Sequence, residues 1–338
     1  MADEDGKYKF VTTQTPQRLS FIGGGTDFPD FYTTYGGGVV SSTIDKFIYV
    51  TVKQLSKMFG EGYRLNYSKT EHVETLDQIE NKIARECLRL VEVPAPLFIG
   101  TIADLPASSG LGSSSSFAVG LLYALHLMRG EVPSAGQLAE EACEVELNAL
   151  KQPIGKQDQY AAAFGGLNYI EFDTSGRVRL DPLIVSKSIY DEITQHSLMF
   201  WTGVERDAGD ILAGQKDNIP NRIDELCQLR DMTLECREML LAETLDIVKF
   251  GALLDRNWRI KRELAENVTT DYIDQAYEVA CKAGAFGGKI AGAGGGGFLY
   301  LLVPPNAQEQ VRAVLSDLSE VKITLETRGS RRMHGNVL

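Results

Sequence analysis

A loop rich in serine and glycine, placed between two apolar segments, constrains the fold of this sequence most strongly. The segment Leu97–Ala103 reads LFIGTIA and predicts a buried strand, while residues 114–128 predict a helix that is apolar on nearly every side. Residues 104–117 join the two as DLPASSGLGSSSSF. Because flexible linkers do not normally connect a buried strand to a buried helix, we expect this loop to have a function.

The composition of the loop indicates a phosphate-binding site. Glycine allows backbone conformations that turn successive N–H groups toward one point, and the N-terminus of the following helix attracts anions. The serine hydroxyls add donors, and one of them could ligate a metal ion. The simpler alternative, a Gly/Ser turn with a serine N-cap, leaves the apolar flanks unexplained. The loop is not a Walker A motif, because no Gly-Lys-Ser/Thr follows at the required spacing.

A second glycine-rich segment, GAGGGG at residues 292–297, formally satisfies GxGxxG. It precedes a strand (FLYLLV) and not a helix, which excludes a Rossmann fingerprint. That strand carries no lysine in a VAIK-like setting and no HRD or DFG follows, which excludes a protein-kinase glycine loop. A turn needs fewer glycines, so we expect close backbone approach to a ligand or to the first loop.

Two other segments carry charged residues next to glycine or proline: PQRLSFIGGGTD at residues 16–27 and PIGKQDQY at residues 153–160. Taken alone, Arg18 and Asp27 fit surface ion pairs equally well. Asp158 taken alone fits a carboxylate that stabilises a helix N-terminus. Only the combination of these segments with the two glycine-rich ones assigns Arg18, Asp27 and Asp158 to one functional site.

The composition excludes several classes of function. The chain has 34 Lys and Arg against 46 Asp and Glu, a net charge of −12, which argues against a nucleic-acid binder. Its five cysteines form no CxxC pair and its four histidines are scattered, so no zinc site is expected. The N-terminus lacks the pattern of a signal peptide, and the apolar stretch at residues 117–128 is too short to cross a bilayer. We expect a cytoplasmic protein without nucleic-acid or membrane partners.

The length of 338 residues suits two domains. The pattern of strands and helices loosens around residues 182–191, where we place the boundary. The second half reads strand, helix, helix, strand, helix, strand, and its last strand is predicted at residues 322–327. We therefore expect an α+β fold, with an ATP-binding, catalytic domain at residues 8–186 and a C-terminal domain at residues 187–338.

In this order, PQRLSFIGGGTD, DLPASSGLGSSSS, PIGKQDQ and KIAGAGGGGF resemble the GHMP small-molecule kinases, which include galactokinase, homoserine kinase and mevalonate kinase. The resemblance covers about residues 10–303. It implies an N-terminal nucleotide-binding domain like ribosomal protein S5 and a C-terminal ferredoxin-like α/β layer. It also implies ATP and Mg²⁺ as cofactors, a small-molecule substrate, and a habit of forming homodimers.

The resemblance further implies roles for individual residues. Asp158 would take the proton of the substrate hydroxyl, Arg18 would stand beside that hydroxyl, and Ser114 and Glu146 would ligate Mg²⁺; taken alone, Glu146 equally fits a solvated position on its helix. The implied contacts to the ATP phosphates are Pro106, Ser108, Ser109, Gly110, Leu111, Gly112, Ser113, Ser114 and Ser115. The implied contacts to the substrate are Gly24, Gly25, Thr26, Asp27, Asp30, Gly155, Gly294, Gly295 and Gly296.

Within the family, GGGTDFPDFY and QPIGKQDQY resemble the branch that acts on D-glycero-D-manno-heptose 7-phosphate, with the kinase portion of fucokinase as a neighbour. Galactokinases carry Glu-His before the Thr-Asp, and mevalonate kinases carry lysine in place of Arg18. The branch implies phosphorylation of the anomeric C1 hydroxyl to the 1,7-bisphosphate, in nucleotide-activated heptose biosynthesis for surface polysaccharide. The alternatives are a kinase for another sugar, such as fucose or galactose, and a catalytically silent sensor of sugar and ATP.

The phosphate of such a substrate requires cationic partners. The run RNWRIKR could supply them, although a solvated helix face explains the run better; its basic residues are Arg256, Arg259, Lys261 and Arg262.

Overall fold

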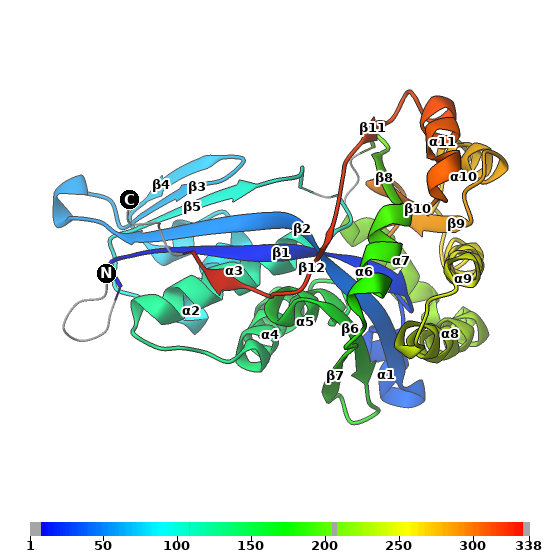
Figure 1. The fold of residues 1–338 in the computed structure, drawn as a ribbon. Helices are drawn as coiled ribbons and strands as arrows, with labels where there is room; N and C mark the ends of the chain where they lie inside the picture. Colours follow the sequence, from blue (N-terminus) through cyan, green and yellow to red (C-terminus); the bar gives the residue numbers. More distant parts are fainter. Residues whose placement is uncertain (1–7, 108, 205–207, 334–338) are drawn as a thin grey trace.

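The computed structural model describes residues 8–107, 109–204 and 208–333, and its first half is organised around two long strands. β1 (Phe10–Ile22) and β2 (Gly37–Gln54) pair antiparallel over most of their length. Short strands extend this sheet on the side of β2 that faces away from β1 (Figure 1): β3 (Tyr63–Asn66), β4 (Thr70–Val73), β5 (Leu97–Ala103), β6 (Leu167–Phe172) and β7 (Val178–Pro182).

β1 contains a proline within its length, since it runs from Phe10 through Pro16 to Ile22. Its register against β2 shifts between Pro16 and Gln17, which accommodates a proline that cannot donate to the ladder. Arg18 therefore lies on a strand directly after a bulge, where its side chain is re-aimed relative to a regular strand.

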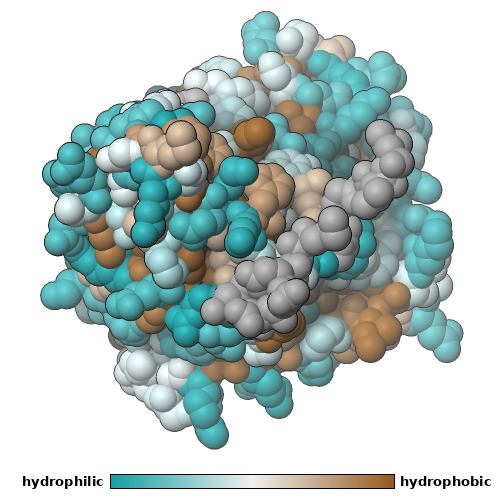
Figure 2. All heavy atoms as spheres, turned by 90° about the vertical axis from the view of Figure 1, so that its left-hand side faces the viewer, coloured by the Kyte–Doolittle hydropathy of each residue, from teal (hydrophilic) through white to brown (hydrophobic). Residues whose placement is uncertain are grey.

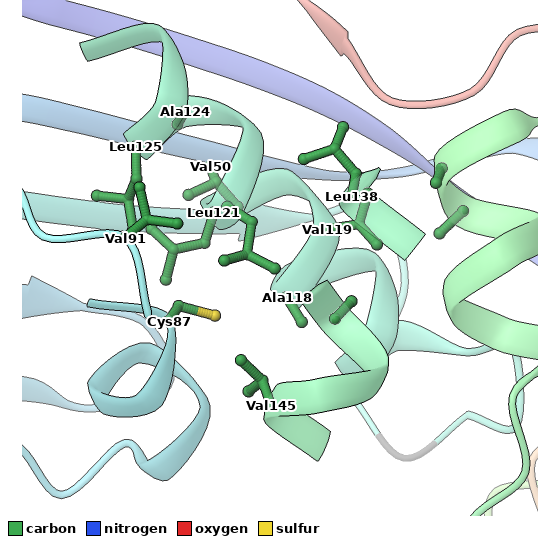
Figure 3. Packing of buried hydrophobic residues seen from close by; sticks show 14 of the residues in the cluster. Val50, Cys87, Val91, Ala118, Val119, Leu121, Ala124, Leu125, Leu138 and Val145 are labelled. Carbon is green, nitrogen blue, oxygen red and sulfur yellow. The ribbon is translucent and has the colours of Figure 1, made fainter. Parts of the chain in front are cut away.

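Helices cover one face of the first sheet, as Figure 1 shows: α2 (Lys82–Leu90), α3 (Ser113–Met128), α4 (Ala135–Cys143), a π-helical turn (Glu144–Ala149) and α5 (Gln157–Phe164). α3 is largely buried, and Figure 3 shows Ala118, Leu121 and Leu125 packing among side chains from its neighbours. Its apolar character on all sides is therefore explained by burial. Gly120 brings it close to β1, where the Thr13 hydroxyl donates to the Gly120 carbonyl at 2.9 Å.

The second layer is an antiparallel sheet in the order β11-β8-β10-β9, formed by Ser319–Glu320, Ser197–Trp201, Phe298–Leu302 and Gly287–Ile290. Its helices are α6 (Lys187–His196), α7 (Ala208–Asn218), α8 (Ile223–Leu241), α9 (Ile247–Lys261), α10 (Asp271–Lys282) and α11 (Gln308–Val314), while α1 (Pro29–Tyr35) belongs to the first half. The two layers share a hydrophobic core, in which Phe21 of β1 contacts Phe250 of α9 and Tyr300 of β10. The predicted α+β fold class is confirmed.

The final strands return to the first sheet, so the prediction that a strand at residues 322–327 closes the second layer is wrong. β12 (Leu325–Glu326) pairs with β2, and β13 (Arg331–Arg332) pairs with β1. On β2, residues 37–42 pair with β6 and residues 48–54 pair with β5, which leaves an unpaired edge between them. β12 fills that edge and satisfies its backbone groups.

We propose a division between the two units near residues 186 and 187, at the segment between β7 and α6. Residues 8–186 and 187–338 would then form the units, with the chain after β11 crossing back onto the first sheet. The segment after β11 is thereby joined to β2 through β12 and to β1 through β13.

Within the part of the chain that the structure describes, no helix is long and apolar enough to span a bilayer. Figure 2 shows one end of the molecule, where hydrophobic side chains lie in separate groups between hydrophilic ones.

Candidate active site

The predicted phosphate loop lies where β5 ends and α3 begins. Gly110 and Gly112 have φ angles of +79° and +76°, a region that favours glycine, and Gly112 precedes the first turn of α3. The start of the loop is anchored by Asp104, whose carboxylate accepts the backbone N–H of Phe47 at 2.9 Å. The loop therefore ends at the N-terminus of α3, whose free N–H groups favour an anion. Ser108 lies outside the described residues.

The second glycine segment packs directly on this loop. A Cβ on Gly292 would overlap the backbone of Gly110, and a Cβ on Gly110 would overlap the carbonyl of Ala291. A Cβ on Gly297 would overlap the carbonyl of Ser109. The expected close approach between the two glycine-rich segments is therefore confirmed. The sequence pattern alone left open whether the partner was a ligand or the first loop.

The middle of that segment lies against other backbone. A Cβ on Gly294 would overlap the carbonyl of Val268, and the Gly295 N–H donates to that carbonyl at 2.7 Å. A Cβ on Gly296 would overlap the carbonyl of Val204. A substrate contact from Gly294, Gly295 and Gly296 stays a prediction.

Arg18 and Asp158 form a bidentate ion pair beside the loop. Arg18 Nε and Nη2 donate to Asp158 Oδ1 and Oδ2 at 2.7 and 2.8 Å, and Arg18 Nη1 donates to the Gly110 carbonyl at 2.6 Å. Arg18 is 6% exposed, so its charge is held in place by the protein. A Cβ on Gly112 would come within 3.1 Å of Asp158 Oδ2, which places the carboxylate at the start of α3. The surface ion pair considered for Arg18 is therefore wrong.

Glu146 is completely buried, so the solvated position considered for it is wrong. It lies in the π-helical turn, and its Oε2 accepts the Ser115 hydroxyl and the Gln159 amide, each at 2.7 Å. Its Oε1 has no hydrogen-bond partner among the described residues. Burial raises the pKa of Glu146 to about 7, although the neighbouring polar side chains of Ser115, Gln159 and Ser114 favour the charged form and act against burial. An orphaned carboxylate oxygen beside serine hydroxyls is a donor set that suits Mg²⁺.

The structure differs in one detail from the implied metal pair. Ser114 is exposed and close enough to lower the pKa of Glu146, but the direct hydrogen bond to Glu146 comes from Ser115. No three His, Cys, Asp or Glu side chains of the described residues come together as a metal site. Mg²⁺ bound here would therefore take one carboxylate, serine hydroxyls and nucleotide phosphate oxygens, as is usual in kinases.

Asp27 is held beside this centre by the turn that contains the triple glycine. Its Oδ1 accepts the Gly25 N–H at 3.1 Å, and its Oδ2 accepts the Gln157 side-chain amide at 2.9 Å. Burial raises the pKa of Asp27, and the charge of Asp158 adds to the rise. Thr26 is buried and hydrogen-bonded to the backbone of Gly23 and Gly38, so it shapes the turn. Asp30 is exposed and lies 3.5 Å from Lys216.

Gly155 gives Asp27 its space, which leads to a testable prediction. A Cβ at Gly155 would overlap the carboxylate of Asp27, so Gly155→Ala should displace this carboxylate and destabilise the protein by about 1–3 kcal/mol. Denaturant unfolding measures this loss. Gly136→Ala is the matched control, because Gly136 lies on α4 with no atom nearer than 3.9 Å, and the free energy of unfolding should stay the same or rise. Equal stabilities of the two variants would contradict the packing of Gly155 on Asp27.

Lys261 belongs to this centre, although its run RNWRIKR fits a solvated helix face in the sequence. Arg256, Arg259 and Arg262 form ion pairs with Glu235, Asp255 and Asp274, as expected for a helix face. Lys261 instead is 4% exposed, and its Nζ donates to the Gly292 carbonyl at 2.6 Å. Leu254, Trp258 and Lys261 are buried and follow one another at spacings of four and three residues, so Lys261 falls on the apolar stripe of α9. That spacing was the available signal.

Comparison with known proteins identifies the family. Residues 81–166 match the GHMP kinases N terminal domain, and residues 239–320 match the GHMP kinases C terminal domain. The chain is 31% identical to D-glycero-alpha-D-manno-heptose 7-phosphate kinase of Campylobacter jejuni, over 88% of this chain and 90% of that protein. It is 24% identical to L-fucokinase/L-fucose-1-P guanylyltransferase of Bacteroides fragilis, where it spans 95% of this chain and 38% of the larger protein.

A solved structure agrees with these matches. The crystal structure of a D-glycero-D-manno-heptose 1-phosphate kinase from Bacteroides thetaiotaomicron superposes with a TM-score of 0.79 and 26% identity, covering 96% of this chain and 99% of that one. This chain thus combines the phosphate loop and the Arg18–Asp158 ion pair with both GHMP kinase domains. The chain belongs to the GHMP kinase family of phosphotransferases, which use ATP to phosphorylate an alcohol group.

Proposed function

We propose that this enzyme is a sugar kinase that transfers the γ-phosphoryl group of ATP to the anomeric C1 hydroxyl of D-glycero-D-manno-heptose 7-phosphate, giving the 1,7-bisphosphate. The observation that carries the proposal is the carboxylate of Asp158, fixed by Arg18 at the start of α3. The Campylobacter relative, at 31% identity, supports the choice of sugar. The product would enter the synthesis of nucleotide-activated heptose for surface polysaccharide.

ATP would bind with its phosphates against the loop at residues 106–115. The backbone N–H groups of the loop and the α3 N-terminus balance the phosphate charge. Glu146 and the hydroxyls of Ser114 and Ser115 would hold Mg²⁺, which supplies positive charge to the phosphate oxygens. The two glycine-rich segments brace each other, so the loop keeps its shape during transfer.

Asp158 would accept the proton of the C1 hydroxyl while that oxygen forms its bond to the γ-phosphorus and ADP leaves. An anomeric hydroxyl is more acidic than a simple alcohol, which reduces the demand on a carboxylate base. Arg18 holds Asp158 through both carboxylate oxygens and places positive charge next to the attacking oxygen. Asp27, fixed by Gly25 and Gln157, would bind a sugar hydroxyl.

A substrate panel tests this proposal. Purified protein with MgATP should release ADP fastest with heptose 7-phosphate, compared with heptose 1-phosphate, galactose, fucose, mannose and mevalonate. Heptose 1-phosphate belongs in the panel because the Bacteroides protein is named for it. Turnover of another sugar, with none of heptose 7-phosphate, would contradict the substrate and leave the kinase activity standing.

The silent-sensor alternative is disfavoured by the residues themselves. A relative without activity would be expected to lack Asp158, Arg18 or Glu146, and all three are present and brought together in one region. We further propose a cytoplasmic enzyme, where ATP is at hand; its five cysteines are free thiols, as expected in a reducing compartment.

A further inference from the structure

A group of buried polar side chains surrounds Gly24, next to the catalytic pair. From the position that a Cβ on Gly24 would take, Lys261 Nζ lies at 3.1 Å, Ser20 Oγ at 3.7 Å and Gln157 Nε2 at 3.8 Å. Gly23 and Gly25 have positive φ angles that favour glycine, whereas Gly24 does not. The glycine at position 24 therefore provides space in front of these polar groups and is not required by backbone conformation.

Part of the hydrogen-bonding capacity of this set is unused among the described residues. Ser20 is 3% exposed and Gln157 9% exposed, yet Ser20 Oγ and Gln157 Oε1 have no hydrogen-bond partner within residues 8–107, 109–204 and 208–333. Lys261 has three N–H donors, of which one reaches the Gly292 carbonyl. Buried polar groups normally find partners, and leaving them unpaired is costly. This set is therefore built to receive polar atoms from a ligand.

The mixture of donors and acceptors identifies the chemical class of that ligand. A phosphate accepts hydrogen bonds and would be repelled by Gln157 Oε1 and by the neighbouring carboxylate of Asp27, which Gln157 Nε2 contacts at 2.9 Å. Sugar hydroxyls both donate and accept, so they can satisfy an ammonium, a hydroxyl and an amide carbonyl together. We propose that Lys261, Ser20 and Gln157 bind hydroxyl groups of the acceptor sugar, with Lys261 as the main donor. This inference rests on the proposed function, because it requires a polyhydroxylated acceptor.

The position of Lys261 links the acceptor site to the C-terminal layer. It stands at the end of α9, reaches Gly24 on one side and Gly292 on the other, and Gly292 packs on Gly110 of the phosphate loop. The acceptor would therefore be held from both layers at the place where the two glycine-rich segments meet. A sugar whose hydroxyls do not match this set would lose contacts with the charged lysine, which gives Lys261 a part in specificity.

Lys261→Met tests the inference, because methionine is similar in length but has neither charge nor donors. With the sugar that the wild type phosphorylates, the acceptor KM should rise about 10- to 100-fold, as expected for the loss of a hydrogen bond from a charged group. The KM for ATP should stay within about twofold of the wild-type value. Ser20→Ala should weaken acceptor binding by a smaller factor. Lys249→Met is the matched control, since Lys249 lies on the same helix with an exposed side chain, and no kinetic change is expected.

The competing explanation is that Lys261 only ties α9 to the Gly292 loop. In that case Lys261→Met would lower the melting temperature of the ligand-free protein and leave the acceptor KM of the folded enzyme unchanged, which would overturn the inference. It would also be overturned if inorganic phosphate raised the melting temperature of the wild type but not of Lys261→Met, because the set would then bind an anion.

Failure of the proposed function gives a different result. If the wild type phosphorylates another sugar, the proposed substrate is wrong, but the same comparison of variants still decides the role of Lys261. If the wild type phosphorylates only mevalonate, the inference about sugar hydroxyls falls together with the proposed function.

Discussion

Asp158→Asn is expected to lower kcat by about 10²- to 10⁴-fold, the range that a positioned general base contributes. Asparagine has the shape of aspartate but cannot take the proton of the acceptor hydroxyl. It also cannot accept both hydrogen bonds of Arg18, so the charge beside the attacking oxygen is less well fixed. Initial-rate assays of ADP release give the change, while ATP binding, measured by calorimetry, should be nearly unaffected.

A control separates this role from a structural one, because Asp158 also lies in the first turn of α5. A carboxylate there stabilises a helix by about 0.3–1 kcal/mol. Asp271 occupies the first turn of α10 and is exposed, so Asp271→Asn should show the same small loss of stability with full activity. Turnover by Asp158→Asn within a few-fold of the wild type would show that Asp158 is not the base.

Glu146→Gln is expected to give a protein that is more stable without ligands and nearly inactive. Glutamine can keep the contacts of Oε2 with Ser115 and Gln159, and it removes a buried charge whose second oxygen has no partner among the described residues. The kcat should fall about 10²- to 10³-fold, because the neutral amide is a poor Mg²⁺ ligand and the phosphate charge loses its counter-ion. Increased stability with lost activity is the pattern of a residue retained for function.

The pH dependence of stability gives this variant a second readout. Burial raises the pKa of Glu146 to about 7 in the folded protein, whereas an unfolded glutamate has the ordinary value near ~4.3. Between these values the folded state binds more protons than the unfolded state. The contribution of this group is therefore fully present below the lower value and is lost as the pH rises through about 7.

Melting temperatures of the wild type should consequently fall relative to Glu146→Gln as the pH is raised from about 5 to 8. Mg²⁺ binding should strengthen over the same range, because the carboxylate must lose its proton to become a ligand. If the melting temperatures of the two proteins differ by the same amount at every pH in this range, the burial of an ionisable Glu146 is contradicted.

Much of this site could be predicted from the sequence because it depends on local pattern. The phosphate loop is predicted by the order of a strand, a loop of serine and glycine, and an apolar helix over residues 97–128. The four consecutive glycines predict the close packing of the Gly292 segment. The bidentate partner of Arg18 needed the whole fold, since Asp158 lies 140 positions further along the chain. Only the order of the four segments connected them in advance.

Other features could not be predicted because they depend on tertiary packing. Glu146 lies in a π-helical turn, which sequence periodicity does not reveal, and its hydrogen bond comes from Ser115 of α3. β12 joins the first sheet because an edge of β2 is open there, a long-range condition. The spacing of Lys261 from Leu254 and Trp258 signals its burial on α9, but its position between Gly24 and Gly292 depends on the whole fold.

The phosphorus NMR spectrum of the reaction product tests the central claim most directly. After incubation of heptose 7-phosphate with MgATP and the enzyme, we predict a new phosphate resonance coupled to the anomeric proton, with the C7 phosphate retained and ADP formed in equal amount. The Asp158→Asn variant should give no such resonance within the same time. A new phosphate on any other carbon, or no transfer to the sugar while ATP still binds, would contradict the account.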